Sequence, residues 1–151
     1  MKDVEFNGFI CSTNKAKIDL DVVHDYLCNE SYWAKGIPIE VVKNSVENSL
    51  CFGIYQGSEQ VGFARVITDF STFAYLCDLF VLAKFQGKGL SKFLMKCILS
   101  HSNLKGLRRF LLATRDAHGL YKQVGFTPIA RPEFWMEIND SEVYSKNEKR
   151  F

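Results

Sequence analysis

The sequence lacks the charge imbalance and the long apolar runs that mark several classes of protein. Its 19 basic and 17 acidic residues leave a formal net charge of +2 over 151 residues. So small an excess gives no reason to expect nucleic acid or an anionic membrane as a partner. Apolar runs such as Phe80-Val81-Leu82-Ala83 are far shorter than the roughly 20 residues of a membrane-spanning helix. The first residues, MKDVEFNGF, contain no apolar secretory core, so we expect no export signal.

The chain also lacks the cysteine spacing of a zinc site or a disulfide framework. No CxxC pair occurs, and the three histidines do not cluster with the cysteines. The five cysteines are Cys11, Cys28, Cys51, Cys77 and Cys97. An odd number of scattered cysteines is typical of free thiols in a reducing compartment. We therefore expect a cytoplasmic protein that holds no metal.

No internal repeat or low-complexity linker divides the chain, and its length suits one domain with a single core. Apolar periodicity predicts the element order β-α-α-β-β-β-α-β-α-β-β. The predicted strands are 8–13, 50–55, 60–67, 74–81, 109–114, 126–130 and 134–138, and the predicted helices are 20–27, 39–48, 90–98 and 119–124.

This order predicts a mixed α/β (α+β) sheet in a single domain, 1–151, with its core at about 8–138. The strand 74–81 is apolar almost throughout, which favours a central place in the sheet. Asp19 and Asp21 are both available to cap the first helix. The tail 139–151 is mostly polar and charged, so we expect its end to fray.

The stretch FQGKGLSKFLMK, residues 85–96, places two glycines between a predicted strand and a predicted helix. Free N–H groups at the start of a helix attract anions, and glycine lets a phosphate approach the backbone. A P-loop would need glycine where Leu82 stands, and a Rossmann GxGxxG would need it where Lys92 stands, so both motifs fail. On these residues alone, an ordinary tight turn and a phosphate cradle both stay open.

A third spacing matches. Gln86–Ser91 follows the pattern (Arg/Gln)-x-x-Gly-x-(Gly/Ala), apart from Ser91 at the last place, and resembles the pyrophosphate motif of the GNAT superfamily of N-acetyltransferases. Two further features stand in that family's order: the triplet Leu79-Phe80-Val81 before the turn, and Tyr121 four residues before Gly125-Phe126. The resemblance covers about 8–138 and is similar to a small bacterial-type branch. It implies a GNAT fold of six to seven strands and about four helices, in which central strands splay apart.

The resemblance also implies how acetyl-CoA, the co-substrate, would bind. The backbone of Leu79, Phe80 and Val81 would hold the pantetheine arm and polarise the thioester. The N–H groups of the turn would hold the pyrophosphate. The turn residues are Gln86, Gly87, Lys88, Gly89, Leu90 and Ser91. Asp116 stands where many relatives carry an asparagine that touches the cofactor, although a carboxylate cannot donate the same hydrogen bond.

Acetyl transfer to an amine needs a neutral nitrogen, a polarised carbonyl and a proton for the leaving thiolate. Tyr121 matches the family's general acid, a role that suits a phenol; a tyrosine that only packs in the core is the alternative. Asp78 stands where many relatives have a glutamate that deprotonates the amine through water, or it only helps to bind a cationic acceptor. His118 is a second candidate base, or a residue that orients its loop.

The acceptor is an amine that the sequence leaves open between a small molecule and a protein. Aromatic and acidic side chains expected near it are Tyr32, Trp33, Asp69, Phe73 and Tyr75. They would suit a cationic, partly apolar amine, whereas packing in the core is the alternative. A non-catalytic or regulatory CoA-binding module is the competing function, which the presence of Tyr121 and Asp78 disfavours. A homodimer stays open by analogy with the family.

Overall fold

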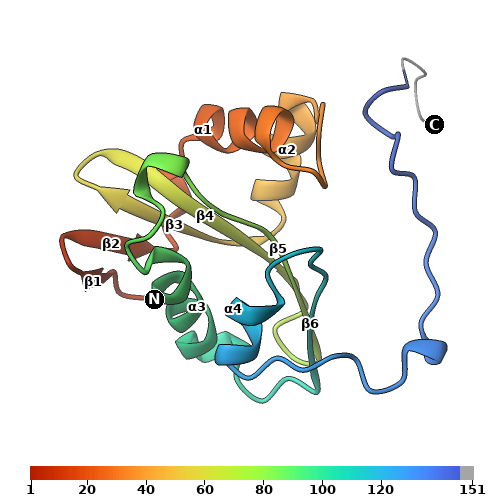
Figure 1. The fold of residues 1–151 in the computed structure, drawn as a ribbon. Coiled ribbons are helices and arrows are strands. Elements are labelled where there is room, and N and C mark those ends of the chain that lie inside the picture. The colour runs from red at the N-terminus through yellow and green to blue at the C-terminus, as the bar shows by residue number, and fades with distance from the viewer. Residues whose placement is uncertain (147–151) are drawn as a thin grey trace.

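Six strands form one sheet in which each strand lies beside its neighbours in sequence (Figure 1). The computed structural model describes residues 1–146. The strands are β1 (Val4–Phe6), β2 (Phe9–Ser12), β3 (Leu50–Gln56), β4 (Glu59–Thr68), β5 (Phe73–Val81) and β6 (Arg109–Leu112). The first four pairings are antiparallel, whereas β5 and β6 run parallel. The predicted mixed sheet is therefore confirmed.

Helices cover both faces of the sheet, α1 and α2 on one face and α3 and α4 on the other (Figure 1). The helices are α1 (Leu20–Asp25), continued by a π-helical segment (Tyr26–Glu30), α2 (Ile39–Glu47), α3 (Leu90–Ser100) and α4 (His118–Gln123). Short 3-10 helices lie at Lys15–Lys17, Ala83–Phe85, Ser102–Leu104 and Pro132–Phe134. The carboxylate of Asp19 accepts hydrogen bonds from the N–H groups of Asp21 and Val22, so Asp19 is the cap of α1.

Each face of the sheet has its own apolar core. On the α3 face, Leu94 and Ile98 recur at helical spacing and are fully buried in the same cluster as Phe52 of β3. On the α1 face, helix and strand residues form a second cluster. Val81 of β5 belongs to the first cluster and Phe80 to the second, so the end of β5 is held from both sides. Burial of each such side chain contributes about 1.5–3 kcal/mol.

The central strands splay apart as predicted. β6 pairs with β5 only where Phe73–Leu76 lies beside Arg109–Leu112, and β5 continues to Val81 without it. Asp78 has a positive φ of 54°, and the β4–β5 register shifts between Phe63 and Arg65, opposite this residue. Such a bulge bends a strand locally. The N–H and C=O groups on the outer side of 77–81 therefore face a wedge instead of a neighbouring strand.

Two predicted strands, 126–130 and 134–138, are wrong. These residues form extended chain and one 3-10 helix, and within residues 1–146 they pair with no strand (Figure 1). Apolar alternation makes a strand only where a sheet edge accepts it, and Pro128 and Pro132 have no N–H to donate. β1 was not predicted, because its three residues are exposed and lack a clear pattern.

The predicted tail, 139–151, falls partly outside the described residues, which end at 146. Within the described part, Tyr144 packs beside the core of the α1 face, next to Gly36. No helix in residues 1–146 is long and apolar enough to cross a membrane.

Candidate active site

A cleft of about 700 Å³ occupies the wedge between β5 and β6. One wall is the part of β5 that has no β6 partner, from Cys77 to Val81. The opposite wall is the segment 113–117 after β6, together with Leu120 and Tyr121 of α4. Residues of the loop that follows α1 close a third side. The predicted triplet Leu79-Phe80-Val81 therefore lies along the length of the cleft, where its backbone faces the wedge.

The glycine turn forms a second, smaller hollow of about 220 Å³. The two hollows share Val81, Gln86, Ser91 and Leu120, so the turn and the cleft are continuous. The amide Nε2 of Gln86 donates to the carbonyl oxygen of Val81 at 3.1 Å. This bond ties the turn to the end of β5.

Both glycines of the turn adopt a backbone conformation that other residues avoid. Gly87 has φ 78° and Gly89 has φ 77°, and a Cβ at Gly87 would meet no atom within 4 Å. The constraint is therefore conformational rather than steric crowding. Gly89 is the N-cap of α3 and offers no capping side chain. The N–H groups of the first turn of α3 are therefore available to an anion.

Charged side chains around the turn have separate partners or lie at its margin. Lys84 forms an ion pair with Glu59 at 2.8 Å. Lys92 lines the small hollow, and Lys88 is exposed. The backbone N–H groups of the turn are therefore its main candidates for holding an anion.

Tyr121 reaches the cleft from α4 and is partly buried. Burial raises the pKa of its phenol to about 12, and the neighbouring Tyr32 and Asp116 act in the same direction. The phenol is therefore protonated at neutral pH, which is the state that a proton donor requires. The ring of Phe126 packs edge-on at 6.0 Å between centroids, which fixes the orientation of Tyr121.

Asp78 lies in the wall of the cleft with both carboxylate oxygens engaged. Oδ2 accepts from Nε of Arg65 at 2.8 Å, and Oδ1 accepts from the indole Nε1 of Trp33 at 2.9 Å. Arg65 also donates to the hydroxyl of Ser49 at 3.1 Å. The ion pair is nearly buried, so Asp78 is anchored in position and its negative charge is matched. No local pattern pointed to Arg65, because its pairing with Asp78 depends on the strand register.

The chain is similar to known proteins. The family model described as the acetyltransferase (GNAT) family matches residues 21–126, well over half of the chain. The chain belongs to this family. The resemblance inferred from the sequence motifs is thereby confirmed.

Individual GNAT relatives cover most of the chain. A crystal structure of a protein assigned to the GNAT acetyltransferases, from Xanthomonas campestris pv. campestris, matches with a TM-score of 0.91 and 45% identity over 94% of this chain and 100% of that one. The uncharacterised N-acetyltransferase ycf52 of Pyropia yezoensis is 31% identical over 82% of this chain and 72% of its own length. A protein of Gibberella zeae assigned as an acetyltransferase is 29% identical over 75% of each chain.

The GNAT protein is an N-acetyltransferase, an acyltransferase that uses acetyl-CoA. Its cleft suits this co-substrate, because a turn with free N–H groups opens into a channel beside free strand backbone. Within residues 1–146 no three His, Cys, Asp or Glu side chains gather as a metal site, and all five cysteines are free.

Three of the predicted acceptor residues line the GNAT cleft: Tyr32, Trp33 and Tyr75. Tyr32 also bridges to the segment after β6. Its hydroxyl accepts from the N–H of Arg115 at 2.9 Å, and the Arg115 guanidinium lies 3.9 Å from the centre of its ring. This bridge joins the α1 loop to the opposite wall.

Two predicted acceptor residues do not reach the cleft. Asp69 caps the β4–β5 turn by accepting from the N–H groups of Ser71, Thr72 and Phe73, and these bonds, with that of the Thr72 hydroxyl, lower the pKa of its carboxyl. Phe73 lines a different groove, on the outer side of β6. The sequence placed them together because they flank one turn, but the turn points away from the wedge.

The remaining predicted site residues divide in the same way. Asp116 lines the cleft and lies 3.6 Å from Arg115. His118 begins α4, is exposed, and is not among the residues that line the cleft. Of the two candidate bases, only Asp78 therefore faces the wedge.

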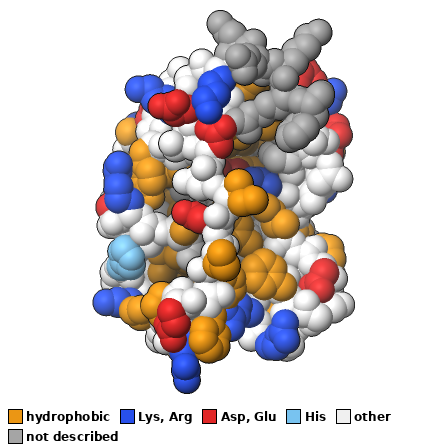
Figure 2. Space-filling model, turned by 90° about the vertical axis from the view of Figure 1, so that its right-hand side faces the viewer, with side chains coloured by type: hydrophobic (Ala, Val, Ile, Leu, Met, Phe, Trp, Pro, Cys, Tyr) orange, Lys and Arg blue, Asp and Glu red, His pale blue; other side chains and the backbone are white. Residues whose placement is uncertain are grey.

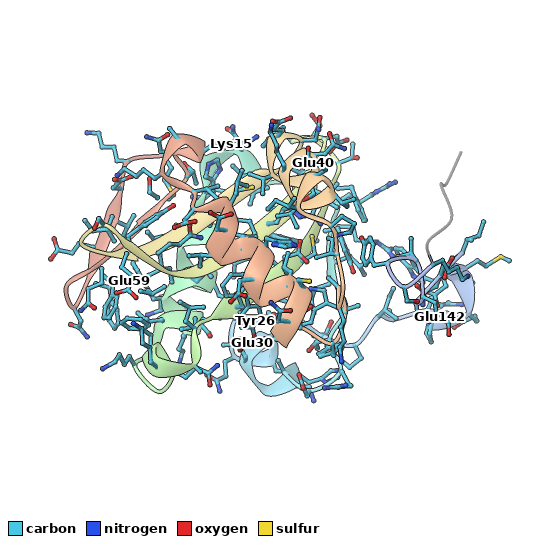
Figure 3. All side chains as sticks on the ribbon, turned by 90° about the horizontal axis from the view of Figure 1, so that it is seen from above. Lys15, Tyr26, Glu30, Glu40, Glu59 and Glu142 are labelled. Atoms are coloured by element: carbon cyan, nitrogen blue, oxygen red, sulfur yellow. The ribbon has the colours of Figure 1, made fainter. Side chains whose placement is uncertain are left out.

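Sequence reasoning missed Tyr26 and Glu30, both of which line the cleft. They lie together at one end of the α1 segment (Figure 3). The ring of Tyr26 stacks on Phe80 with 4.0 Å between centroids, so it covers the middle of the β5 triplet. Their spacing of four residues was a usable signal, because it places both on one helical face. The helical pattern had assigned Tyr26 to the core.

Proposed function

We propose that the protein transfers the acetyl group of acetyl-CoA directly to a primary amine, with Tyr121 as the general acid. The observation that carries this proposal is the meeting of three features in one cleft. Free β5 backbone forms a wall, the glycine turn opens into one end, and the protonated phenol of Tyr121 faces the same space. A module that only bound CoA would need the turn and the strand but no proton donor.

Placement of the co-substrate follows from these features. The pyrophosphate would lie on the N–H groups of 86–91, at the start of α3. The pantetheine arm would extend along Leu79, Phe80 and Val81 and pair with their free backbone groups. Its thioester would then lie beside Tyr121, with a backbone N–H of β5 to polarise the carbonyl.

The reaction needs one proton donor and one proton acceptor, and we assign them to opposite walls of the cleft. The amine nitrogen attacks the thioester carbon, the C–S bond breaks, and the departing thiolate takes the proton of the Tyr121 phenol. The nitrogen must lose a proton, and we propose that Asp78 receives it through a water molecule. Each oxygen of Asp78 accepts one hydrogen bond from protein and keeps a lone pair for that water.

The acceptor that fits best is a cationic amine with an apolar body. Aromatic rings from Tyr32, Trp33 and Tyr75 line the cleft, and the carboxylate of Glu30 lies on the same side as Tyr26. Aromatic faces and carboxylates both attract ammonium groups before they lose their proton. A small-molecule amine and a lysine or N-terminus of a protein both satisfy this chemistry.

Two measurements test the proposal. Calorimetric titration with acetyl-CoA should show binding at one site per chain, and a panel of amines assayed for free-CoA release should reveal turnover. Binding of acetyl-CoA without turnover on small amines or on lysine-containing peptides would favour the non-catalytic module. An absence of acetyl-CoA binding would rule out both functions.

A further inference from the structure

Two neighbouring residues of the loop that follows α1 join the two walls of the cleft. The indole Nε1 of Trp33 donates to the carboxylate of Asp78 in β5 at 2.9 Å. The hydroxyl of Tyr32 accepts from the N–H of Arg115, after β6, at 2.9 Å, and the Arg115 guanidinium lies 3.9 Å from the centre of the Tyr32 ring. We call Tyr32 and Trp33 the aromatic bridge.

The aromatic bridge crosses the cleft near the point where β5 and β6 separate. The last residues that pair there are Leu76 and Leu112. Asp78 lies two residues beyond that pair and Arg115 lies three residues beyond it, so the bridge stands at the narrow end of the wedge. The glycine turn opens into the other end, beyond Val81. Acetyl-CoA with its phosphates on the turn would therefore have its thioester beside the bridge.

The residues to which we assign proton transfer lie beside the aromatic bridge. Burial raises the pKa of Tyr121 to about 12, and Tyr32 is the first of the neighbouring groups that act in the same direction. Trp33 holds one carboxylate oxygen of Asp78. Each residue of the bridge therefore lies near one of the two groups that would move a proton.

One side of the aromatic bridge faces the cleft and the other faces solvent. Tyr32 and Trp33 both line the cleft, yet they are 44% and 41% exposed. Their rings meet edge to face with 5.0 Å between centroids. The loop between α1 and α2 lies on the right-hand side of Figure 1, and Figure 2 shows that side with hydrophobic side chains gathered through its middle. The bridge is thus an aromatic cover over this part of the cleft.

The loop fixes the backbone of the aromatic bridge from both sides. Ser31 and Ala34, which flank the bridge, are buried. The hydroxyl of Ser31 donates to the C=O of Leu27 at 2.6 Å and accepts from the N–H of Ala34 at 3.1 Å. Farther along, the N–H of Gly36 donates to the C=O of Cys28 at 3.0 Å. These bonds hold the two aromatic side chains in place before any ligand binds.

The hydrogen bonds of the aromatic bridge point to more than a lining of aromatic rings. Either ring could line an acceptor site without a bond to a wall, but the polar ends of Tyr32 and Trp33 bond to different walls. Asp78 has a positive φ of 54°, a strained conformation for this residue. Its carboxylate is held by Trp33 on one oxygen and by Arg65 on the other. The bridge therefore secures β5 at the residue where this strand bends away from β6.

We propose that Tyr32 and Trp33 are positioning residues that hold the two walls at a fixed separation and keep water from the thioester, so that acetyl transfer is favoured over hydrolysis. This inference rests on the proposed function. In hydrolysis a water oxygen attacks the thioester carbon and the C–S bond breaks. One water proton goes to the departing thiolate, the other goes to solvent, and acetate is released. The same cleft would polarise the carbonyl for either nucleophile, so the access of water decides between the two reactions.

The test compares free-CoA release from acetyl-CoA without an amine and with a saturating amine. The double variant Tyr32→Phe, Trp33→Phe keeps aromatic rings and removes both hydrogen-bonding groups. It should release CoA without an amine about threefold faster, and the ratio of hydrolysis to transfer should rise about tenfold, because water gains access while transfer slows. Calorimetry should show a nearly unchanged dissociation constant of acetyl-CoA. The double variant Tyr55→Phe, Trp135→Phe makes the same changes outside the cleft and should keep both rates.

Two kinetic results would overturn the proposal. If the KM of the amine rose while the rate without an amine stayed the same, Tyr32 and Trp33 would only line the acceptor site. If both rates fell by the same factor, together with the melting temperature, the two hydrogen bonds would only stabilise the fold.

Hydrogen exchange at the N–H of Arg115, measured by NMR, tests the aromatic bridge without any turnover. A protein that acetylated no amine would refute the proposed function, and this measurement would still decide whether the bridge exists. Trp33 bonds to the opposite wall, yet Trp33→Phe should speed exchange at Arg115 about threefold, because a bridge released from one wall holds the other less firmly. Trp135→Phe should leave this exchange unchanged. Equal exchange at Arg115 in Trp33→Phe and in the unaltered protein would show that the two bonds act separately, and the proposal would fail.

Discussion

We propose the phenol of Tyr121 as the proton donor, and removing its oxygen tests that role directly. Tyr121→Phe should lower kcat by about 100-fold, since general acid–base groups contribute roughly 10²–10⁴-fold, and should leave the dissociation constant of acetyl-CoA unchanged. Because burial raises the pKa of Tyr121 to about 12, the unaltered enzyme should gain activity with rising pH as the amine loses its proton. No loss of activity from Tyr121 is expected below about pH 10.

The control for this variant is Tyr144→Phe, which removes a phenolic hydroxyl outside the cleft. Its kcat should equal that of the unaltered enzyme. Steady-state kinetics of free-CoA release and calorimetry of acetyl-CoA binding provide both readouts. An unchanged kcat in Tyr121→Phe would show that water or another group protonates the thiolate.

The proposed role of Asp78 as a base is tested by removing its negative charge. Asp78→Asn keeps an oxygen that can accept from Trp33 but removes the carboxylate beside Arg65. If Asp78 takes the proton of the amine, kcat/KM should fall about tenfold or more near neutral pH and approach that of the unaltered enzyme as the amine becomes neutral at higher pH. A loss that is equal at every pH would instead assign Asp78 to holding Trp33 and Arg65 in place. Melting temperatures measured alongside report the cost of the unpaired Arg65.

Single residues also show where sequence reasoning succeeded and failed at the site. Tyr32, Trp33 and Tyr75 were expected near the acceptor and do line the cleft, whereas Asp69 satisfies its own turn. A carboxylate two to four residues before free N–H groups satisfies them locally, which a search for acceptor residues overlooks. The partner of Asp78, Arg65, depends on the register of two strands and has no local signal.

At the scale of elements, the glycine turn allows a test of whether its backbone conformation or its positive charge contributes more to binding acetyl-CoA. Alanine at Gly87 or Gly89 would have to adopt a left-handed conformation, at about 1–2 kcal/mol per residue. If the turn moves to relieve that strain, its N–H groups no longer point toward the pyrophosphate. Gly89→Ala should therefore raise the dissociation constant of acetyl-CoA about tenfold, and Lys88→Ala should raise it by less.

Gly106 offers a matched control for the turn. It has φ 75° and no atom within 4 Å of its would-be Cβ, and it lines neither hollow of the site. Gly106→Ala should therefore lower stability as Gly89→Ala does, without weakening acetyl-CoA binding. Equal binding by Gly89→Ala and the unaltered protein would remove the turn from the site.

Most elements were predictable because their patterns are local. The β3–β4 hairpin, β5 and α3 each combine a clear apolar period with turn residues at their ends. Residues 134–138 show the limit of such patterns. They have the alternation of a strand, but a strand also needs the edge of another strand to pair with, and no local pattern shows whether such an edge lies beside it. The π-helical form of Tyr26–Glu30 was not predicted, because its apolar period continues that of α1.

For the whole molecule, the wedge implies that acetyl-CoA links parts of the sheet that the protein itself leaves apart. Between the end of β5 and the α4 segment, the described chain has a cleft of about 700 Å³ rather than a strand pairing. A ligand that contacts both walls and the α3 turn stabilises the folded state by about 2.7 kcal/mol at a concentration of 100 times its dissociation constant. For a chain of this length, that should raise the melting temperature by about 5–10 °C. Acetyl-pantetheine, which lacks the pyrophosphate, should give a smaller shift at the same concentration. Hydrogen exchange should show protection at 77–81, at the turn 86–91 and in α4. Protection confined to the turn would mean that only the phosphates bind there, and the pantetheine arm would have to be placed outside the wedge.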